Sequence, residues 1–493
     1  MDDSAREFVG TFQKFMQDVI NQAAVGQSTR TPLGEKLEAF LATDASLLPI
    51  VTHEFGAHRL VDADLALAEL ASNGGEPPIG VSGGQQREHS SLSELLFGPF
   101  MKFDVGPVDY TSEPDGPDSS RRVISFGVHR LLIDDKPVVV VQRAAKPQVG
   151  REHASIEILC ADTATSTRFL AEFSRLMLER SVLRGQVLSF TGDQYRNGSA
   201  GATFLARPTV TSDSVILPPG VLETIVRHVV GIGEQKARLV EAGQHLKRGV
   251  LLYGPPGTGK TLTVRHLLAR TPGTTAVLLT GTSIQFITQA AELARAMQPS
   301  IVVLEDVDLV ASERGMHGPQ PLLFAVLDAL DGLDGDADVT FILTTNRVQV
   351  LERALAERPG RVDLAVEIPL PDSDARRRLF HRYAMGLPFS SDAVDAAADR
   401  AVDTTGSFAK ELVRRAVLTA AEAERTVTDD DLAAALDELL ASSAQLARNL
   451  LGGGAESPGG SAGAESSAHG SGGTWTAHVP DSVASFTSGS TIE

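Results

Sequence analysis

The chain lacks most features that mark secreted or membrane-bound proteins. It has one cysteine, Cys160, so no disulfide can form within the chain, which fits a reducing compartment. Its apolar neighbours predict that this thiol is buried in a core. No apolar run approaches the roughly 18 residues that a membrane helix needs. The first residues are acidic and lack a signal-peptide pattern, so we expect a soluble, cytoplasmic protein without a membrane partner.

Basic residues are also scarce relative to acidic ones. The 44 lysines and arginines stand against 63 aspartates and glutamates, which gives a net charge of −19. This excess of negative charge argues against a broad nucleic-acid surface, although a local basic channel remains open.

Apolar sequence is present in quantity, and it follows a pattern. Hydrophobic residues make up 42% of the 493 residues, a length that suits about three domains. From about residue 216, strand-like apolar runs alternate with helical stretches, which is typical of a parallel sheet with crossover helices. The runs lie at 250–253, 276–280, 301–304, 339–343 and 364–368. The pattern predicts an α/β domain over 216–371.

The other parts of the chain differ from this domain. Residues 1–215 mix helical and strand patterns and are expected to form an α+β region of one or two subdomains, with 1–70 largely helical. Residues 372–450 lose the strands and are expected to form helices only. Residues 451–493 are rich in Gly and Ser, so disorder is expected there.

Residues 254–261 read GPPGTGKT, between a strand-like run and a helical stretch. This pattern in this context predicts a phosphate-binding loop, because glycines let backbone N–H groups turn towards a phosphate. Lys260 is expected to reach the β- and γ-phosphates of a nucleotide, and Thr261 to ligate Mg²⁺. The candidate nucleotide-binding residues are Gly254, Pro255, Pro256, Gly257, Thr258, Gly259, Lys260, Thr261 and Leu262.

Another apolar run ends in carboxylates, at Ile301–Asp308. A nucleoside triphosphatase needs one carboxylate near Mg²⁺ and another that polarises the attacking water. We assign Glu305 to the first task and Asp306 to the second. Taken alone, the pattern also suits an ordinary acidic strand-to-loop transition.

Polar residues at two later turns complete the candidate catalytic set. Asn346 follows the run Val339–Leu343, where its amide could orient the attacking water, although Asn is also an ordinary turn residue. Arg358 and Arg361 flank a Pro-Gly turn, and their guanidinium groups suit γ-phosphate oxygens. Surface solvation is the alternative for either arginine alone. The candidate catalytic residues are therefore Lys260, Glu305, Asp306, Asn346, Arg358 and Arg361.

These elements in this order resemble the AAA family, the ATPases associated with diverse cellular activities. The similarity covers about residues 216–440. In this chain the family's Walker A loop, Walker B strand, sensor-1 residue and arginine fingers fall at Gly254–Thr261, Leu304–Asp306, Asn346, and Arg358 with Arg361. The resemblance implies a five-stranded P-loop nucleotide domain with a helical lid, and ATP and Mg²⁺ as cofactors. It also implies a hexameric ring in which a neighbour's arginines complete each site.

Three features depart from the usual pattern of the family. The acidic pair is Glu305 then Asp306 instead of Asp then Glu. A similar order occurs in the mitochondrial AAA chaperones that assemble respiratory complex III, and residues 185–230 are faintly similar to that group. Phe286 is the one candidate for the aromatic pore loop of unfoldases, with packing in the core as the alternative. Lys410 falls where other branches carry a basic sensor-2 residue, or it is a solvated lysine.

The resemblance implies an ATPase that remodels a protein client, with the N-terminal region choosing the client. An ATP-gated oligomeric scaffold with little turnover is the alternative, favoured by the reversed acidic pair and the weak pore loop. A nucleic-acid motor fits the acidic balance less well. A metalloprotease is not expected, because the string from His53 to His58 spaces its histidines one residue too far apart for zinc on one helix face.

Overall fold

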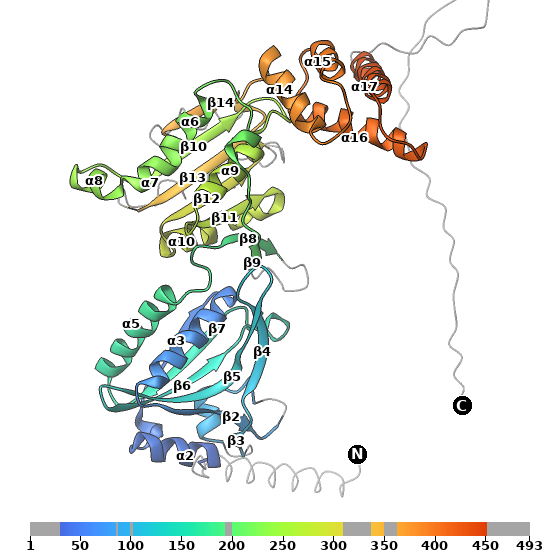
Figure 1. The fold of residues 1–493 in the computed structure, drawn as a ribbon. Coiled ribbons are helices and arrows are strands. Elements are labelled where there is room, and N and C mark those ends of the chain that lie inside the picture. The colour runs from blue at the N-terminus through green and yellow to red at the C-terminus, as the bar shows by residue number, and fades with distance from the viewer. Residues whose placement is uncertain are drawn as a thin grey trace, which may run out of the picture. The chain divides into compact units, whose positions relative to one another are not determined.

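The computed structural model describes residues 30–84, 87–98, 102–192, 200–308, 337–349 and 362–450 (Figure 1). This part of the chain contains two seven-stranded sheets and a group of helices that follows the second sheet in sequence. The first sheet ends at Cys160 and the second begins at Val187. The tail expected to be disordered, 451–493, lies outside the described residues.

The first sheet is antiparallel, with the strand order β1-β7-β6-β5-β2-β3 and with β4 paired to β5. The strands are β1 (Ile50–Phe55), β2 (Glu76–Ser82), β3 (Asp104–Gly106), β4 (Asp109–Pro114), β5 (Ser120–Ile133), β6 (Lys136–Arg143) and β7 (Ala154–Cys160). The four valines of β6, Val138–Val141, are all buried and face two different cores in alternation. β-Branched residues suit a strand that is covered on both faces.

Helices cover both faces of this sheet. The helices of this region are α2 (Pro32–Leu41), α3 (Leu60–Ser72), α4 (Leu92–Leu96) and α5 (Thr163–Glu179). Side chains of α3 and α5 share a core with Val138 and Val140, whereas those of α2 and α4 share one with Val139 and Val141. Cys160 lies in the first of these cores and is 2% exposed, so its predicted burial is confirmed.

Strand β1 lies in a segment for which the sequence predicts mostly helix, so that prediction is wrong over Ile50–Phe55. The strand pairs with β7 along its whole length, and its exposure alternates from one residue to the next. A short, half-buried strand such as β1 is hard to predict from its sequence, because its backbone hydrogen bonds come from the partner strand β7. His53 lies on the strand and His58 in the 3₁₀ turn Ala57–Arg59, so the two histidines do not share a helix.

The second sheet has the strand order β14-β10-β13-β12-β11-β8-β9. Its strands are β8 (Val187–Gly192), β9 (Ala200–Leu205), β10 (Arg248–Tyr253), β11 (Thr275–Thr280), β12 (Ser300–Glu305), β13 (Val339–Thr345) and β14 (Leu364–Glu367). The five predicted runs form the five neighbouring strands from β14 to β11, which are all parallel. The sheet therefore has more than the five strands that the family resemblance implies. Strand β8 adds a parallel strand beside β11, and β9 pairs antiparallel with β8.

These two additional strands precede residue 216, where the sequence pattern of the domain begins. Their sequences, VLSFTG and AGATFL, are short and partly polar, so no apolar run marks them. Leu188 and Phe190 of β8 nevertheless lie in the same core as Val277 of β11. Pairing with β11, rather than local sequence, therefore decides that this segment belongs to the second sheet.

Helices surround the second sheet and continue beyond it. Among the described residues, those before β14 are α6 (Val221–Val226), α7 (Ile232–Glu234), α8 (Lys236–Glu241), α9 (Lys260–Arg270) and α10 (Ile287–Ala296). Those after β14 are α14 (Ser373–Ala384), α15 (Ser391–Arg400), α16 (Gly406–Glu422) and α17 (Asp429–Leu450), which is the all-helical pattern expected there. Side chains of Asp372, Ser390 and Thr405 accept backbone N–H bonds at the starts of α14, α15 and α16. Of the helices described, none combines the length and the apolar character needed to cross a bilayer.

A buried histidine is expected to make the first sheet sensitive to acid. His129 of β5 is 4% exposed and its Nε2 lies 2.9 Å from Gln142 Oε1. Burial lowers the pKa of His129 from 6.5 to about 4, against the opposing effect of the Gln142 hydrogen bond. As the pH falls, His129 is protonated in the unfolded chain before it is protonated in the folded one. The folded state therefore loses stability between these two pKa values. From pH 7 to pH 5 we expect a loss of about 2 kcal/mol in the opening free energy of β5.

Hydrogen exchange of β5 peptides at the two pH values, corrected for intrinsic exchange rates, measures this loss. His129→Gln is the control, because its amide keeps a polar partner for Gln142 and does not titrate in this range. Equal pH sensitivity in the wild type and in this variant would contradict the assignment to His129.

Candidate functional site

The loop between β10 and α9 requires glycine at specific positions. Gly254, Gly257 and Gly259 have φ values of 143°, 78° and 111°, a region that side chains rarely adopt. A Cβ at Gly254 would lie 2.2 Å from the carbonyl oxygen of Ile368, just after β14. The glycines therefore allow the turn and also the close approach of the neighbouring backbone.

Lys260 begins α9 and folds back over this loop. Its side chain is largely buried, and Nζ donates to the carbonyl oxygens of Gly254 and Pro255, each at 2.8 Å. Burial lowers the pKa of Lys260, while the charges of Asp306 and Asp308 act in the opposite direction. The ammonium group is thus held at the loop, where the sequence predicts the phosphates to bind.

Glu305 is the last residue of β12, and its side chain is hydrogen-bonded by Thr261 of α9. Burial raises the pKa of Glu305, and the neighbouring charge of Asp306 adds to this shift. The Thr261 hydrogen bond and the charge of Arg265 act against it. A hydroxyl and a half-buried carboxylate in contact form a donor set that suits Mg²⁺, which prefers oxygen ligands.

Asp306 and Asn346 meet at the ends of two neighbouring strands. Because β12 and β13 are parallel and paired, the residues that follow them lie at the same edge of the sheet. Asn346 Nδ2 donates to Asp306 Oδ1 at 3.1 Å, and the Asp306 N–H donates to the Thr344 hydroxyl at 3.1 Å. Asp306 has a φ of 52°, in the left-handed region that Asp and Asn adopt more readily than most residues.

Asp308 supports this arrangement, although sequence analysis assigned it no role. It is 5% exposed, and its Oδ1 accepts from the Thr345 hydroxyl at 2.9 Å and from the Asn346 N–H at 3.2 Å. The carboxylate therefore orients the backbone that carries Asn346. In the sequence, only its place in the acidic run Ile301–Asp308 indicates a role for Asp308. The residues that it contacts lie on and just after another strand, β13.

A cavity of about 420 Å³ unites most of these residues. Its lining comprises Val215–Leu217, Pro256–Leu262, Arg265, Asp306, Asn346, Leu379, Tyr383, Gly406, Ser407 and Lys410. The loop, one acidic residue and the asparagine thus share one cavity with residues of α14 and α16. Leu379 and Tyr383 were missed because no local motif marks them and they approach the loop only in three dimensions.

Two of the remaining sequence predictions can be placed in the structure. Lys410 is exposed and lines the cavity. Phe286 is 7% exposed and lies in the core, with its ring 6.2 Å from that of Phe190. The alternative of packing in the core is therefore confirmed for Phe286, because its ring lies against Phe190 of β8. Arg358 and Arg361 lie outside the described residues.

Comparison with known proteins agrees with this geometry. Residues 250–370 match the family model described as "ATPase family associated with various cellular activities (AAA)". The chain is 32% identical over 269 residues to ATP-dependent zinc metalloprotease FtsH 2 of Sphaerobacter thermophilus, covering 52% of this chain and 41% of that protein. It is 32% identical over 254 residues to the proteasome-activating nucleotidase of Methanothermobacter thermautotrophicus, covering 48% and 61%.

A third relative, 26S protease regulatory subunit 6A of Caenorhabditis elegans, is 32% identical over 185 residues, covering 35% of this chain and 43% of that protein. The chain thus spans about half the length of the curated relatives it matches. The matched segment contains the phosphate loop, both acidic residues and Asn346. Residues 250–370 thus match an AAA ATPase domain, and the proteins of that family bind ATP with Mg²⁺ and hydrolyse it.

Proposed function

We propose that the protein couples ATP hydrolysis to the remodelling of a protein client, as a ring of identical subunits in the cytoplasm. The observation that carries this proposal is the convergence of Lys260, Asp306 and Asn346 on one cavity at the phosphate loop. Residues 1–215 would select the client, and the lid over 372–450 would respond to the nucleotide. The relatives named above, a proteasome-activating nucleotidase among them, support a role in handling proteins.

Each site residue has a task in this proposal. Lys260 and the backbone N–H groups of 254–261 would hold the β- and γ-phosphates, and Thr261 with Glu305 would hold Mg²⁺, which would neutralise developing charge on the phosphates. Water attacks the γ-phosphorus and ADP leaves. Asp306 accepts the water's proton, and Asn346 orients the water and the carboxylate together.

The reversed acidic pair is compatible with these tasks. The contact of Glu305 with Thr261 supports the metal assignment, and that of Asp306 with Asn346 supports the assignment to water. Glutamate is longer than aspartate by one methylene, so the first carboxylate reaches towards α9 without a shift of the strand. The same order of the acidic pair supports a proposed relation to the mitochondrial AAA chaperones that assemble respiratory complex III.

Assembly would complete the site. Arg358 and Arg361 of one subunit would stabilise the transition-state charge in the next, as arginine fingers do in related phosphoryl transfer. A hexamer is the ring size that the family resemblance implies. The burial of Phe286 favours a second candidate, an ATP-gated scaffold with little turnover, because this phenylalanine is not available to grip a polypeptide.

Steady-state ATPase and oligomer mass, measured in one buffer, separate the two candidates. We expect the wild type to turn over as a ring, and casein, used as a generic unfolded client, to raise the rate. Lys260→Ala should weaken ATP binding by about 10–100-fold, because a hydrogen bond to a charged group contributes about 1.5–3 kcal/mol. Assembly driven by ATP without measurable hydrolysis would replace the motor with the scaffold.

A further inference from the structure

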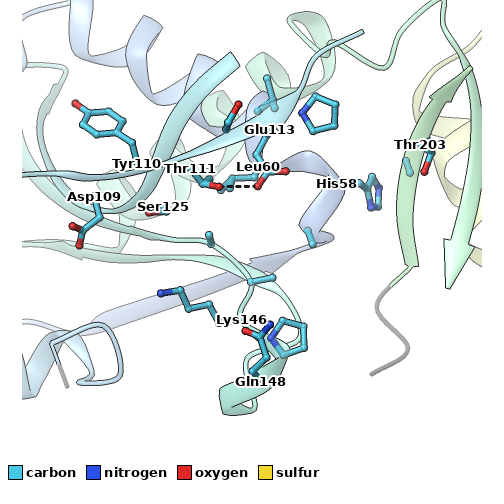
Figure 2. Close-up of a pocket in the computed structure, with 18 of the residues that line it drawn as sticks. His58, Leu60, Asp109, Tyr110, Thr111, Glu113, Ser125, Lys146, Gln148 and Thr203 are labelled. Carbon is cyan, nitrogen blue, oxygen red and sulfur yellow. Dashed lines mark hydrogen bonds between the residues drawn. The ribbon is translucent and has the colours of Figure 1, made fainter. Parts of the chain in front are cut away.

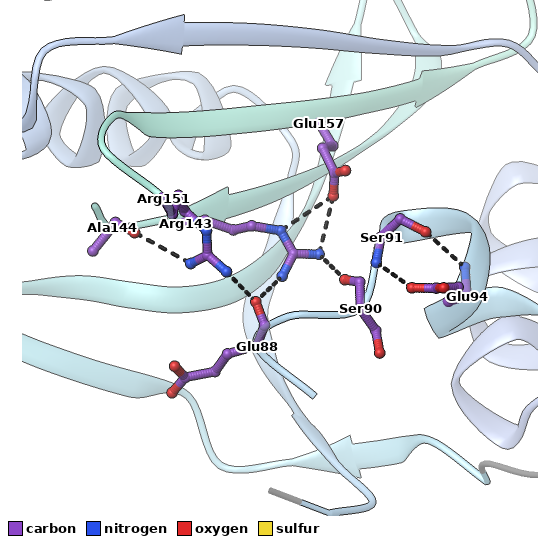
Figure 3. Close-up of polar contacts among 8 residues, drawn as sticks. All are labelled: Glu88, Ser90, Ser91, Glu94, Arg143, Ala144, Arg151 and Glu157. Carbon is purple, nitrogen blue, oxygen red and sulfur yellow. Dashed lines mark hydrogen bonds and ion pairs between the residues drawn. The ribbon is translucent and has the colours of Figure 1, made fainter. Parts of the chain in front are cut away.

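The charges of Arg143 and Lys146, near the first sheet, are matched by partners in the same region. Figure 3 shows Arg143 of β6, which is 4% exposed and donates to Glu157 at 3.0 Å. Figure 2 shows Lys146 at a cavity of about 780 Å³ that β4 also lines, and this lysine pairs with Glu88. These contacts stabilise the fold around the first sheet. At the nucleotide edge of the second sheet, in contrast, buried polar side chains hold residues of the candidate site in place.

The backbone pairing of β12 with β13 ends before Asp306, at Leu304 and Leu343. Strand β13 stays paired with β10 as far as Thr345 and Tyr253, the residue before the phosphate loop. Asp306 follows the last residue of β12 and lies beyond the end of both of its ladders, with β11 and with β13. The sheet therefore holds the end of β13 firmly, whereas Asp306 depends on contacts that side chains make.

The hydroxyl of Thr344 makes such a contact with the backbone of Asp306. The Asp306 N–H donates to Thr344 Oγ1 at 3.1 Å, and Thr344 is 1% exposed. Asp306 has a left-handed φ of 52°, which costs free energy for any residue with a side chain. A buried hydrogen bond is stronger than one in water, so this contact can keep the strained turn in place. The turn in turn fixes the direction in which the Asp306 side chain leaves the backbone.

This direction brings the Asp306 carboxylate to Asn346, whose Nδ2 donates to Asp306 Oδ1 at 3.1 Å. The Asn346 backbone is held from the other side, because its N–H donates to Asp308 Oδ1 at 3.2 Å. Asp306 and Asn346 line the nucleotide cavity, whereas Thr344 and Asp308 are not among its lining residues. Thr344 can therefore affect the candidate site only through Asp306, and not by touching a nucleotide.

Another threonine of β13 offers a direct comparison. Thr340 is 0% exposed, and its Oγ1 has no hydrogen-bond partner within the part of the chain that the structure describes. Thr344 is almost equally buried, but its hydroxyl accepts the Asp306 N–H. The same strand thus carries one buried threonine with this contact and one without it, so the effect of the contact can be separated from that of a buried hydroxyl.

We propose that Thr344 is a positioning residue for ATP hydrolysis. By holding the Asp306 N–H, it aims the Asp306 carboxylate at the water whose proton this carboxylate accepts as the water attacks the γ-phosphorus and ADP leaves. The inference rests on the proposed function, because Thr344 acts through Asp306. It also bears on the reversed acidic pair. An aspartate in the second position reaches less far than a glutamate, so its placement depends more on the direction that its backbone gives it.

Three variants of the full chain test this role. Thr344→Val removes the hydroxyl but suits a buried strand, Thr344→Ser keeps the hydroxyl, and Thr340→Val removes a hydroxyl that lacks the contact. We expect Thr344→Val to lower kcat by about 10–100-fold, because a misplacement of about 1 Å can cost about 100-fold in rate. Affinity for a fluorescent ATP analogue should stay within about threefold of the wild type. Thr344→Ser should recover most of the lost rate, and Thr340→Val should leave kcat unchanged.

Two further measurements separate positioning from a purely structural role. Hydrogen exchange of a peptide that covers Asp306 needs no ATP, and it should become faster in Thr344→Val but not in Thr344→Ser, because only valine removes the acceptor of the Asp306 N–H. In an Asp306→Asn background, single-turnover hydrolysis should fall by less than about threefold further when Thr344→Val is added, because residues that act as a unit are not additive.

The wild type distinguishes the two ways in which the test can fail. If it hydrolyses ATP, full turnover by Thr344→Val, an equal loss in Thr344→Ser or Thr340→Val, or a loss that adds fully to that of Asp306→Asn overturns the inference and leaves the proposed function standing. Loss of analogue binding together with a lower melting temperature in Thr344→Val would mean that the hydroxyl supports only the fold, which also overturns the inference. A wild type that binds ATP without hydrolysing it overturns the proposed function, and the inference with it.

Discussion

Replacing Asp306 by asparagine is expected to reduce ATP turnover by about 10²–10⁴-fold, the usual contribution of a positioned general base. The neutral amide cannot accept the water's proton. Its size matches the carboxylate, so the contact with Asn346, now 3.1 Å from Asp306 Oδ1, can persist. Asparagine also tolerates the left-handed φ of 52° at this position, so the backbone is not strained by the change.

Binding of a fluorescent ATP analogue and steady-state phosphate release, measured together, check this result. Affinity for the analogue should stay within about threefold of the wild type, because the proposed phosphate contacts are those of Lys260 and the loop. Glu292→Gln, at an exposed carboxylate on α10, is the matched control and should leave both quantities unchanged. Full turnover by Asp306→Asn would show that another group activates the water.

Replacing Gly254 by alanine is expected to destabilise the nucleotide domain by about 3–5 kcal/mol, from backbone strain and overpacking together. The added Cβ would lie 2.2 Å from the Ile368 carbonyl oxygen, and this neighbour is backbone that cannot turn aside. The φ of 143° adds strain of its own. We expect a lower melting temperature and loss of the stabilisation that ATP gives the wild type.

Gly243→Ala separates the two causes. Gly243 also has a positive φ, 69°, but a Cβ there would meet nothing within 4 Å. Its substitution should therefore cost only about 1–2 kcal/mol, the backbone contribution alone. Thermal unfolding with and without ATP measures both variants. Equal losses would mean that the close approach of β14 to the loop does not restrict the site.

The residues proposed for the nucleotide site come from short local patterns, which is why the sequence alone could nominate them. A loop, a strand and a helix adjacent in the chain place Gly254–Thr261, and each acidic or amide residue follows directly after an apolar strand. Parallel strands direct these ends to one edge, so the meeting of Asp306 and Asn346 follows from the strand pattern. The role of Asp308 could not be predicted from a local pattern, because its partner Thr345 belongs to another strand.

Amino-acid sequence alone determined the class of the second domain, the five parallel strands, the phosphate loop and the order of the acidic pair. Only the tertiary structure decided that β8 and β9 extend the sheet, that β1 is a strand, and that Phe286 is packed in the core. The physical reason is common to all three. Short, half-polar segments acquire their structure from the partners they contact, and those contacts join residues far apart in the chain.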